Sequence, residues 1–254
     1  MKLTGNTILI TGGASGIGRG LAEALHKLGN QVIIAGRRKS HLEATTKANP
    51  GMKAVELDIA DPAAISAFAA RLVADYPSLN VLINNAGIMQ TDDASGKIDD
   101  TLLVSTITTN LFGPIRLTSA LIDHLKTQPS ATIINMTSVL GYVPMAFAAV
   151  YSATKAALHS YTLSQRFMLR GTSVKLQEIA PPWVRTELLN SSEEPRAMPL
   201  DEFITETIAA LGTDAEEVLV ERARPLRDNP GANEHGFVTR FNELLLAGPD
   251  AQAA

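Results

Sequence analysis

The chain has 254 residues, of which 45% are hydrophobic, and its 22 basic and 26 acidic side chains leave a formal net charge of −4. It contains no cysteine, which excludes a disulfide scaffold, an iron–sulfur protein and a thiol nucleophile. It also lacks the basic stripe of a nucleic-acid binder and the roughly 18-residue apolar run that crosses a bilayer. We therefore expect a cytoplasmic protein that binds neither nucleic acid nor membrane.

Short β-rich runs alternate with helical patterns over the first 180 residues. The expected strands are Thr7–Thr11, Gln31–Ala35, Met52–Glu56, Val81–Asn84, Ala131–Met136 and Ser173–Ile179. These runs are continuously apolar, which is typical of strands covered on both faces. Apolar residues at i, i+3 and i+4 predict helices such as Ile17–Leu28, Ala63–Val73 and Leu102–Leu125. The alternation predicts an α/β fold, a doubly wound parallel sheet with helices on both faces.

The pattern changes after Ile179, where Ala180-Pro181-Pro182 forms a stiff break. The expected segments beyond it are a loop at Asn190–Pro199, a helix from about Asp201 and a loop at Arg224–Gly231. No linker or internal repeat sets this part off as a second domain. We therefore expect residues 1–254 to form a single domain, with a substrate lid at about 183–232 and a variant C-terminal segment at 233–254.

A glycine-rich turn, Gly12-Gly13-Ala14-Ser15-Gly16-Ile17-Gly18, joins the first strand to the first helix. Glycines at 12, 16 and 18 allow the backbone to approach a pyrophosphate closely. The N-terminus of the helix adds unpaired N–H groups and a dipole that favours phosphate. An ordinary tight turn is the alternative, but the position between first strand and first helix favours a dinucleotide site.

The segment Thr11-Gly12-xxx-Gly16-Ile17-Gly18 resembles the cofactor motif of the short-chain dehydrogenase/reductase family. Further matches follow in order: Asn84-Asn85-Ala86-Gly87, then Ser138 thirteen residues before Tyr151, then Tyr151-Ser152-Ala153-Thr154-Lys155. Asn110 stands where the family carries its fourth catalytic residue. The resemblance covers residues 5 to about 190 and implies a Rossmann-like domain that binds a nicotinamide dinucleotide.

The expected catalytic residues are Asn110, Ser138, Tyr151 and Lys155. Tyr151 and Lys155 are four residues apart, so a helix would bring them onto one face, and a nearby ammonium lowers the pKa of a phenol. Tyr151 could then act as general acid or base. Ser138 ends a strand at the edge where such sheets bind ligands, and its hydroxyl can donate to a carbonyl oxygen. The resemblance makes Asn110 a water-holding link from Lys155 to solvent and places Lys155 on the nicotinamide ribose.

The resemblance also implies the cofactor-binding residues. They are Gly12, Ser15, Gly16, Ile17, Gly18, Arg37, Arg38, Asp58, Ile59, Asn85, Ala86, Gly87, Tyr151, Lys155, Pro181, Val184 and Thr186. Asp58 and Ile59 are expected at the adenine. Pro182 replaces a glycine that the family usually has, which predicts a stiffer loop there.

The end of the second strand carries the signal for the choice of cofactor. Gly36 stands where NAD-dependent members of the family have an acid, and the arginines Arg37 and Arg38 that follow it can pair with a 2′-phosphate. We therefore predict a preference for NADP(H) over NAD(H), with Arg37 as the main contact. Arginines that only point into solvent, and a preference for NAD(H), are the alternative.

The substrate is expected to contact Ser138 and Tyr151. The apolar walls would come from Trp183, Leu188 and Leu189 on the loop side and from Tyr142, Val143 and Met145 opposite. The sequence has no cluster of basic residues that would indicate a phosphorylated or strongly acidic substrate. We therefore expect a neutral ketone, aldehyde or secondary alcohol. The five histidines show no ligand spacing, and we predict no metal.

The expected function is hydride transfer between NADP(H) and such a carbonyl or alcohol, as in a carbonyl reductase or alcohol dehydrogenase. An alcohol dehydrogenase that prefers NAD(H) and a non-catalytic dinucleotide sensor remain alternatives. The helices Leu102–Leu125 and Tyr151–Leu169 are apolar on more than one face, and the family pairs such helices, so we expect a homodimer or, second, a homotetramer. Gly236-Phe237-Val238-Thr239 only partly matches the family's final strand, so the sequence does not decide whether a seventh strand forms.

Overall fold

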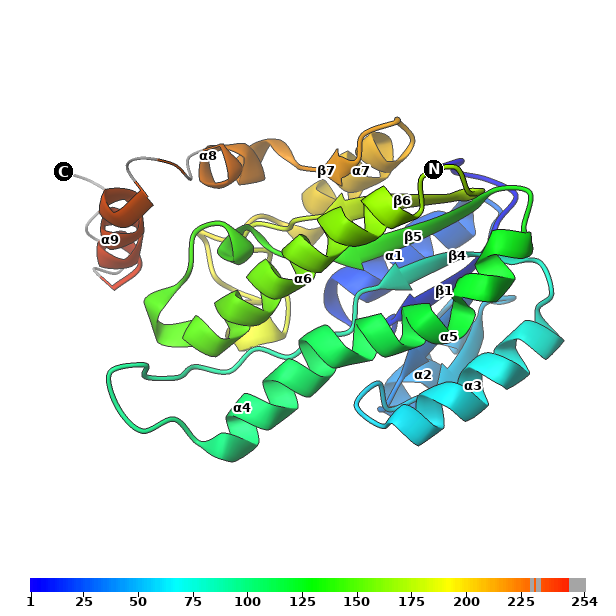
Figure 1. Cartoon of the computed structure of the whole chain (residues 1–254), viewed down its shortest axis with the longest axis horizontal. Helices are drawn as coiled ribbons and strands as arrows, with labels where there is room; N and C mark the ends of the chain where they lie inside the picture. Colours follow the sequence, from blue (N-terminus) through cyan, green and yellow to red (C-terminus); the bar gives the residue numbers. More distant parts are fainter. Residues whose placement is uncertain (229–230, 232–233, 247–254) are drawn as a thin grey trace.

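Seven parallel strands form one sheet in the computed structural model, which describes residues 1–228, 231 and 234–246 (Figure 1). The strands are β1 (Thr7–Thr11), β2 (Gln31–Gly36), β3 (Lys53–Glu56), β4 (Leu79–Asn84), β5 (Ala131–Met136), β6 (Val174–Ile179) and β7 (Glu217–Val218). Their order is β3-β2-β1-β4-β5-β6-β7. The expected Rossmann-like sheet is confirmed, and β1 to β6 lie within two residues of the predicted runs.

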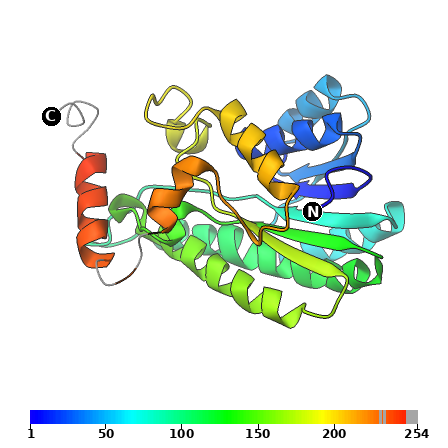
Figure 2. The ribbon, with the colours of Figure 1, turned by 90° about the horizontal axis from the view of Figure 1, so that it is seen from above.

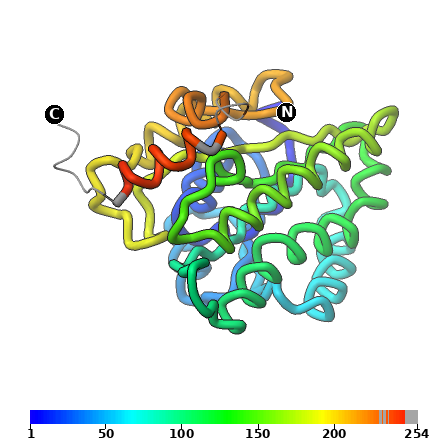
Figure 3. Tube along the Cα trace, turned by 60° about the vertical axis from the view of Figure 1, so that its left-hand side comes forward, coloured from blue at the N-terminus to red at the C-terminus, as the bar shows by residue number. Residues whose placement is uncertain are grey.

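Helices cover both faces of the sheet, with α1, α2 and α7 on one side and α3, α5 and α6 on the other (Figure 2). The helices are α1 (Gly16–Lys27), α2 (Lys39–Ala48), α3 (Pro62–Asp75), α4 (Asp100–Ile107), α5 (Gly113–Thr127), α6 (Ala149–Met168), α7 (Leu200–Leu211), α8 (Arg224–Arg227) and α9 (Glu234–Leu246). The long α4–α5 unit runs beside α6 (Figure 3). Within the described residues, no helix is long and apolar enough to span a membrane.

The central strands are largely apolar because each face of the sheet has its own core, whereas the edge strand β3 is mostly exposed. Ile8 and Ile10 of β1 pack on the α1 side with Leu21 and Leu25, whereas Leu9 faces the α3 and α5 side. All of these side chains are fully buried. Strands covered on both faces favour apolar residues at most positions, which explains why the continuous runs predicted central strands such as β1 correctly.

The direction of chain winding changes at β1, which has β2 on one side and β4 on the other. The chain builds β1, β2 and β3 outward and then returns to place β4 beside β1. A crevice at the carboxyl ends of the strands at such a point is where ligands bind in open α/β sheets. The glycine-rich turn after β1 and the Asn84-Asn85-Ala86-Gly87 segment after β4 meet there.

Three local expectations differ from the structure. The helix predicted at Leu102–Leu125 contains a π-helical turn, η1 (Thr108–Phe112), between α4 and α5. Helix α2 was not predicted because it buries only Leu42 and Thr45. The loop predicted at Arg224–Gly231 begins as helix α8.

The seventh strand is the two-residue β7, which pairs with Glu178 and Ile179 of β6. The segment Gly236–Thr239, which echoed a final strand in the sequence, lies inside α9 instead. A strand of two residues is too short to show any periodicity, so its position depends only on pairing with β6. Of the predicted C-terminal segment 233–254, residues 233 and 247–254 lie outside the described residues.

Candidate active site

A cavity of about 630 Å³ opens at the carboxyl ends of the central strands. The predicted site residues in its wall are Gly12, Ser15, Gly16, Ile17, Gly18, Arg38, Asn85, Ala86, Gly87, Ser138, Tyr151, Lys155, Pro181, Trp183, Val184, Thr186 and Leu188. The predicted site residues outside its wall are Arg37, Asp58, Ile59, Asn110, Tyr142 and Val143. The fold therefore brings most of the candidate residues together, although they come from six separate stretches of the chain.

The glycine-rich turn has the shape that a pyrophosphate needs. A Cβ on Gly18 would lie 2.3 Å from Asn85 Nδ2 and 2.3 Å from the carbonyl oxygen of Gly12, so the backbone there is too close for any side chain. Ser15 is the N-cap of α1, but its side chain makes no capping hydrogen bond. The first N–H groups of α1 thus have no side-chain partner at the cavity wall, an arrangement that fits the binding of a dinucleotide phosphate.

Two asparagines at the end of β4 hold the neighbouring segments in place. Asn85 Nδ2 donates to the carbonyl oxygens of Thr11 at 2.9 Å and Gly12 at 3.3 Å, while Thr11 Oγ1 accepts from the N–H groups of Asn85 and Ala86. Asn84 Nδ2 donates to side-chain oxygens of Thr118 and Asn135, each at 2.9 Å. Both amides hold parts of the fold together. Asn84 ties β4 to α5 and β5, and Asn85 joins the glycine-rich turn to the end of β4.

Ser138, Tyr151 and Lys155 meet in the wall of this cavity. Ser138 follows β5, and Tyr151 and Lys155 lie one turn apart on α6. The Tyr151 and Ser138 hydroxyls share a hydrogen bond. Lys155 Nζ donates to the carbonyl oxygen of Met136 at 2.8 Å and lies 5.5 Å from the centre of the Tyr151 ring. All three side chains are buried, so their hydroxyl and ammonium groups act in surroundings of low polarity.

Burial changes the proton affinities of this group. It raises the pKa of Tyr151 to about 12, against the opposing effect of the Ser138 hydrogen bond, and it lowers the pKa of Lys155 to about 8. The predicted lowering of the Tyr151 pKa by Lys155 is therefore wrong. Burial is the larger of the two effects on this phenol, and Lys155 Nζ is bound by the Met136 carbonyl. At neutral pH Tyr151 is a neutral phenol that can give up a proton.

Asn110 is fully buried in the π-helical turn η1 and does not line the cavity. Its amide binds the backbone of Ile88 twice: Oδ1 accepts from the N–H and Nδ2 donates to the carbonyl oxygen, each at 2.8 Å. A Cβ on Gly87 would lie 3.4 Å from Asn110 Oδ1 and 3.7 Å from Lys155 Nζ. Asn110 therefore lies behind the Lys155 ammonium and holds the chain after β4, and its role as a water-holding link stays a prediction.

The two arginines after β2 lie differently from the sequence expectation. Arg38 lines the cavity, and its Nη2 donates to Ser15 Oγ at 2.7 Å while Nη1 lies 3.3 Å from Glu187 Oε2. Arg37, expected as the main contact, is exposed and outside the cavity wall. Side chains alternate along an extended segment, so only one of two adjacent residues can point to the glycine-rich turn.

The expected adenine contacts lie beyond the cavity. Asp58 Oδ1 accepts from the N–H of Ala60 at 3.0 Å in a local turn after β3. Ile59 is buried against Gly113, where a Cβ would come within 2.7 Å of the Ile59 side chain. Both residues follow β3 at the carboxyl edge of the sheet, and their contact with adenine stays a prediction.

The loop after β6 closes one side of the cavity through Trp183, Leu188 and Leu189. Leu189 and Asn190 both have positive φ angles, 53° and 52°, a backbone conformation that residues other than glycine rarely adopt. Trp183 Nε1 donates to Ser191 Oγ at 2.8 Å and closes this bend. Backbone strain of this kind persists only where the surroundings enforce it, and it is common at ligand sites.

Tyr142 and Val143, expected in the substrate wall, lie outside it. Val143 is buried with Ala180 in a separate apolar cluster. The Tyr142 hydroxyl donates to Glu217 Oε1 at 2.5 Å and to Glu178 Oε1 at 3.2 Å. Burial raises the pKa of Tyr142, with help from the charge of Glu178. The short helical turn after Ser138 carries both side chains away from the cavity toward β6 and β7.

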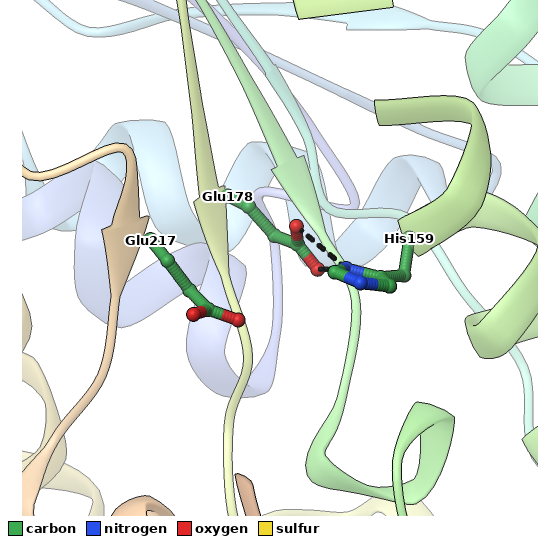
Figure 4. Close-up of side chains that lie close together, drawn as sticks. All are labelled: His159, Glu178 and Glu217. Atoms are coloured by element: carbon green, nitrogen blue, oxygen red, sulfur yellow. Dashed lines mark hydrogen bonds and ion pairs between the residues drawn. The ribbon is translucent and has the colours of Figure 1, made fainter. Parts of the chain in front are cut away.

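The carboxylates that bind Tyr142 belong to a cluster of ionisable residues next to the site. His159 of α6, Glu178 of β6 and Glu217 of β7 bring ligand atoms within 4.8 Å of one another, although their spacing in the sequence gives no sign of it (Figure 4). His159 Nδ1 lies 2.9 Å from both oxygens of Glu178, and Arg227 Nε lies 2.7 Å from Glu217 Oε1. Because each carboxylate has such a partner, the geometry supports an ion-pair network that joins α8 to α6. The expected absence of a metal stays a prediction.

Several apolar side chains line the cavity together with the expected residues. Met89, Phe147, Phe241 and Leu245 were missed in the sequence, whereas Met145 and Leu189 were expected in the wall and lie in it. Phe241 and Leu245 belong to α9, a helix whose periodicity is visible in the sequence. What the periodicity cannot show is which surface such a helix covers.

Known proteins resemble this chain over most of its length. A model of the family described as short chain dehydrogenase matches residues 6–197. The uncharacterised oxidoreductase DltE of Bacillus subtilis (strain 168) is 39% identical over 248 residues, which is 95% of this chain and 98% of that protein.

Solved structures agree with the fold. A short-chain dehydrogenase from Burkholderia cenocepacia J2315 in complex with NADP superposes with a TM-score of 0.83 at 27% identity, covering 94% of this chain and 98% of that one. A short-chain dehydrogenase/reductase from Burkholderia phymatum in complex with NAD superposes with a TM-score of 0.80 at 21% identity, covering 89% and 93%.

Proposed function

Because this chain belongs to the short-chain dehydrogenase/reductase family, we propose that it is an NADP(H)-dependent carbonyl reductase or alcohol dehydrogenase. The family makes it an oxidoreductase that acts on a small molecule with a nicotinamide dinucleotide. One observation carries the finer proposal: Ser138, Tyr151 and Lys155 meet in the same cavity as the glycine-rich turn. A protein that only senses a dinucleotide has no need of a buried proton donor beside that turn.

In the reduction of a ketone or aldehyde, some residues of the site would hold the cofactor and others would bind the carbonyl oxygen and donate its proton. The glycine-rich turn and the N-terminus of α1 would hold the pyrophosphate, and Lys155 would hold the nicotinamide ribose. When bound, the nicotinamide supplies the hydride that adds to the carbonyl carbon. Ser138 donates a hydrogen bond to the carbonyl oxygen, and Tyr151 transfers its proton to that oxygen as charge develops. In alcohol oxidation Tyr151 takes the proton back.

A screen of NADPH oxidation over neutral ketones and aldehydes tests this function directly. We expect turnover with some of these compounds and none with phosphorylated ones. Binding of NADPH without turnover of any carbonyl or alcohol would favour a dinucleotide sensor and contradict the proposal.

The preference for NADP(H) is supported by the charge around the glycine-rich turn. Arg38 binds Ser15 at the cavity wall, Arg37 is next to it, and Gly36 leaves the place of a ribose-binding acid without a side chain. A relative at 27% identity was solved with NADP. We expect kcat/KM for NADPH to exceed that for NADH at least about tenfold, since a hydrogen bond to a charged group contributes about 1.5–3 kcal/mol.

Gly36→Asp should reverse this preference, because a carboxylate repels the 2′-phosphate and accepts from a ribose hydroxyl. A Cβ at Gly36 meets no atom within 4 Å, so the change fits the fold. Gly36→Asn is the matched control, with the same shape and no charge. Steady-state kinetics with both cofactors decide the matter, and a wild-type preference for NADH would contradict the proposal and favour the NAD(H) alternative.

A homodimer is the proposed assembly, with a homotetramer as second choice. Large apolar side chains are exposed on the long helices: Leu163, Phe167 and Met168 on α6, Val104 on α4 and Phe112 in η1. Phe167 is 62% exposed and Met168 77%, which is costly unless a partner covers them. We expect light scattering to give twice the 27.0 kDa mass of one chain, and Phe167→Glu to give a single chain. A monomeric wild type at micromolar concentration would contradict this assembly.

The proposed location is the cytoplasm, whose reducing conditions fit a cysteine-free chain. Cell fractionation with an antibody to the protein tests it, and recovery of the protein from a membrane or secreted fraction would contradict it.

A further inference from the structure

Helix α9 covers one end of the cavity. It lies at the end of the molecule toward which the strands point, apart from the helices that cover the sheet (Figures 1 and 2). Phe241 and Leu245 are four residues apart on α9, and both line the cavity, whereas the intervening Leu244 is exposed and outside the cavity wall. One face of α9 therefore forms part of the cavity wall beside Tyr151.

Asn242 holds α9 in this place. Its Oδ1 accepts from the N–H of Ala146 at 2.5 Å, and its Nδ2 donates to the carbonyl oxygens of Pro144 at 3.1 Å and Val238 at 2.8 Å. The amide thus binds the backbone on both sides of Met145, as a neighbouring strand would. Asn242 is only 8% exposed, and the loop that it binds leads directly into α6 with Tyr151. This contact sets the position of α9 relative to the proton donor.

The wall between α9 and Tyr151 is apolar. It consists of Met89, Met145, Phe147, Leu189, Phe241 and Leu245. Each cationic side chain that the structure describes in the cavity wall has a partner of its own. Arg196 forms two hydrogen bonds to Glu194, Arg38 is paired with Glu187, and Lys155 binds the Met136 carbonyl. Because Arg38 and Lys155 are assigned to the cofactor in the proposed function, Arg196 is the cation that remains among the described lining residues, and Glu194 neutralises it.

We propose that the substrate is an uncharged carbonyl compound or alcohol with an extended apolar tail, and that this tail lies against Phe241 and Leu245. This inference rests on the proposed function and adds to it a substrate class and a determinant of specificity. Asn242 is a positioning residue, because it contacts neither the tail nor the reacting atoms and acts by holding α9. Methionine and leucine walls adapt to tails of different shape, which suits an aliphatic or a ring-containing tail.

A series of linear methyl ketones of increasing length tests the tail site with the whole protein and NADPH. Burial of each added methylene should raise kcat/KM about fourfold until the apolar wall is filled, since a buried methylene contributes about 0.8 kcal/mol. An oxo acid of the same length should be a much poorer substrate, because its carboxylate finds no free cation in the wall. Turnover that does not change with chain length would overturn the inference and leave the proposed function standing.

Substitutions in α9 distinguish a role in binding the tail from a general effect on the stability of the fold. Leu245→Ala and Phe241→Ala should each reduce the ratio of kcat/KM between long and short ketones at least about tenfold, because lost apolar contacts affect only the tail. Leu244→Ala is the matched control and should leave this ratio unchanged. Asn242→Ala should raise KM for the long ketone while the Kd of NADPH stays the same. An unchanged ratio in Leu245→Ala and Phe241→Ala would overturn the inference.

Trp183 gives a readout that does not depend on turnover. It is the single tryptophan of the chain and lines the cavity. Its fluorescence should therefore change when a long methyl ketone or the matching secondary alcohol binds. Tail-dependent binding without turnover, weakened by Leu245→Asp, would support the tail site and contradict the proposed function. Absence of tail-dependent binding would overturn the tail site.

Discussion

Tyr151→Phe is expected to lower kcat for ketone reduction at least about 100-fold, the usual contribution of a positioned general acid. The change removes only the hydroxyl, and the ring remains packed against Met145 and Ala148. Burial raises the pKa of this hydroxyl to about 12, so the wild-type phenol carries its proton throughout the neutral range and can donate it.

The Kd of NADPH should change little in Tyr151→Phe, because the glycine-rich turn and Lys155 remain in place. Tyr161→Phe is the matched control: the same atom is removed from the same helix, outside the cavity wall. We expect wild-type kcat for that variant. Retention of a tenth or more of wild-type activity by Tyr151→Phe would show that another group delivers the proton.

Gly18→Ala is expected to weaken NADPH binding at least about tenfold and to lower the free energy of unfolding by about 1–3 kcal/mol, a typical effect of overpacking. A Cβ at Gly18 would lie 2.3 Å from the Gly12 carbonyl oxygen and 2.9 Å from its carbon. These are backbone atoms of the turn itself, so the clash cannot be relieved by rotating a side chain. The turn must open, and Asn85, whose Nδ2 also lies 2.3 Å away, must move with it.

Gly36→Ala provides the control for this effect, because a Cβ there meets no atom within 4 Å and the residue lies in the same part of the cofactor site. We expect it to bind NADPH and unfold like the wild type. Fluorescence titration with NADPH and thermal unfolding measure the two quantities. If Gly18→Ala binds NADPH as tightly as Gly36→Ala does, the close approach at Gly18 is not what shapes the phosphate site.

Much of the fold and the centre of the site could be predicted from the sequence, because they depend on local patterns. Continuous apolar runs predicted six strands, since a residue such as Leu9 or Ile10 is buried on whichever face it points to. Asp61 followed by Pro62 predicted the start of α3, where Asp61 Oδ1 accepts from the N–H of Ala63 at 2.8 Å. The four-residue spacing of Tyr151 and Lys155 predicted their common face on a helix.

The remaining features depend on which distant segments meet. The pKa of Tyr151 rises because the folded chain excludes water around it, and the sequence contains no measure of that burial. Tyr142 was expected in the substrate wall, but it turns toward Glu178 and Glu217, which β6 and β7 bring beside it. The arginine at the glycine-rich turn is Arg38 because Ser15 and Glu187 come from two other parts of the chain.

By itself, the sequence determined the order of the first six strands, most of the helices between them and the glycine-rich turn. Each of these is set by interactions between residues close together in the chain, and such interactions leave a periodic or contiguous pattern. Only the tertiary structure decided which side chains complete the cavity, above all Phe241 and Leu245. These residues lie about ninety positions from Tyr151, and they reach it because Asn242 binds the backbone at Pro144 and Ala146. A contact over such a separation depends on the whole fold and leaves no local pattern from which it could be predicted.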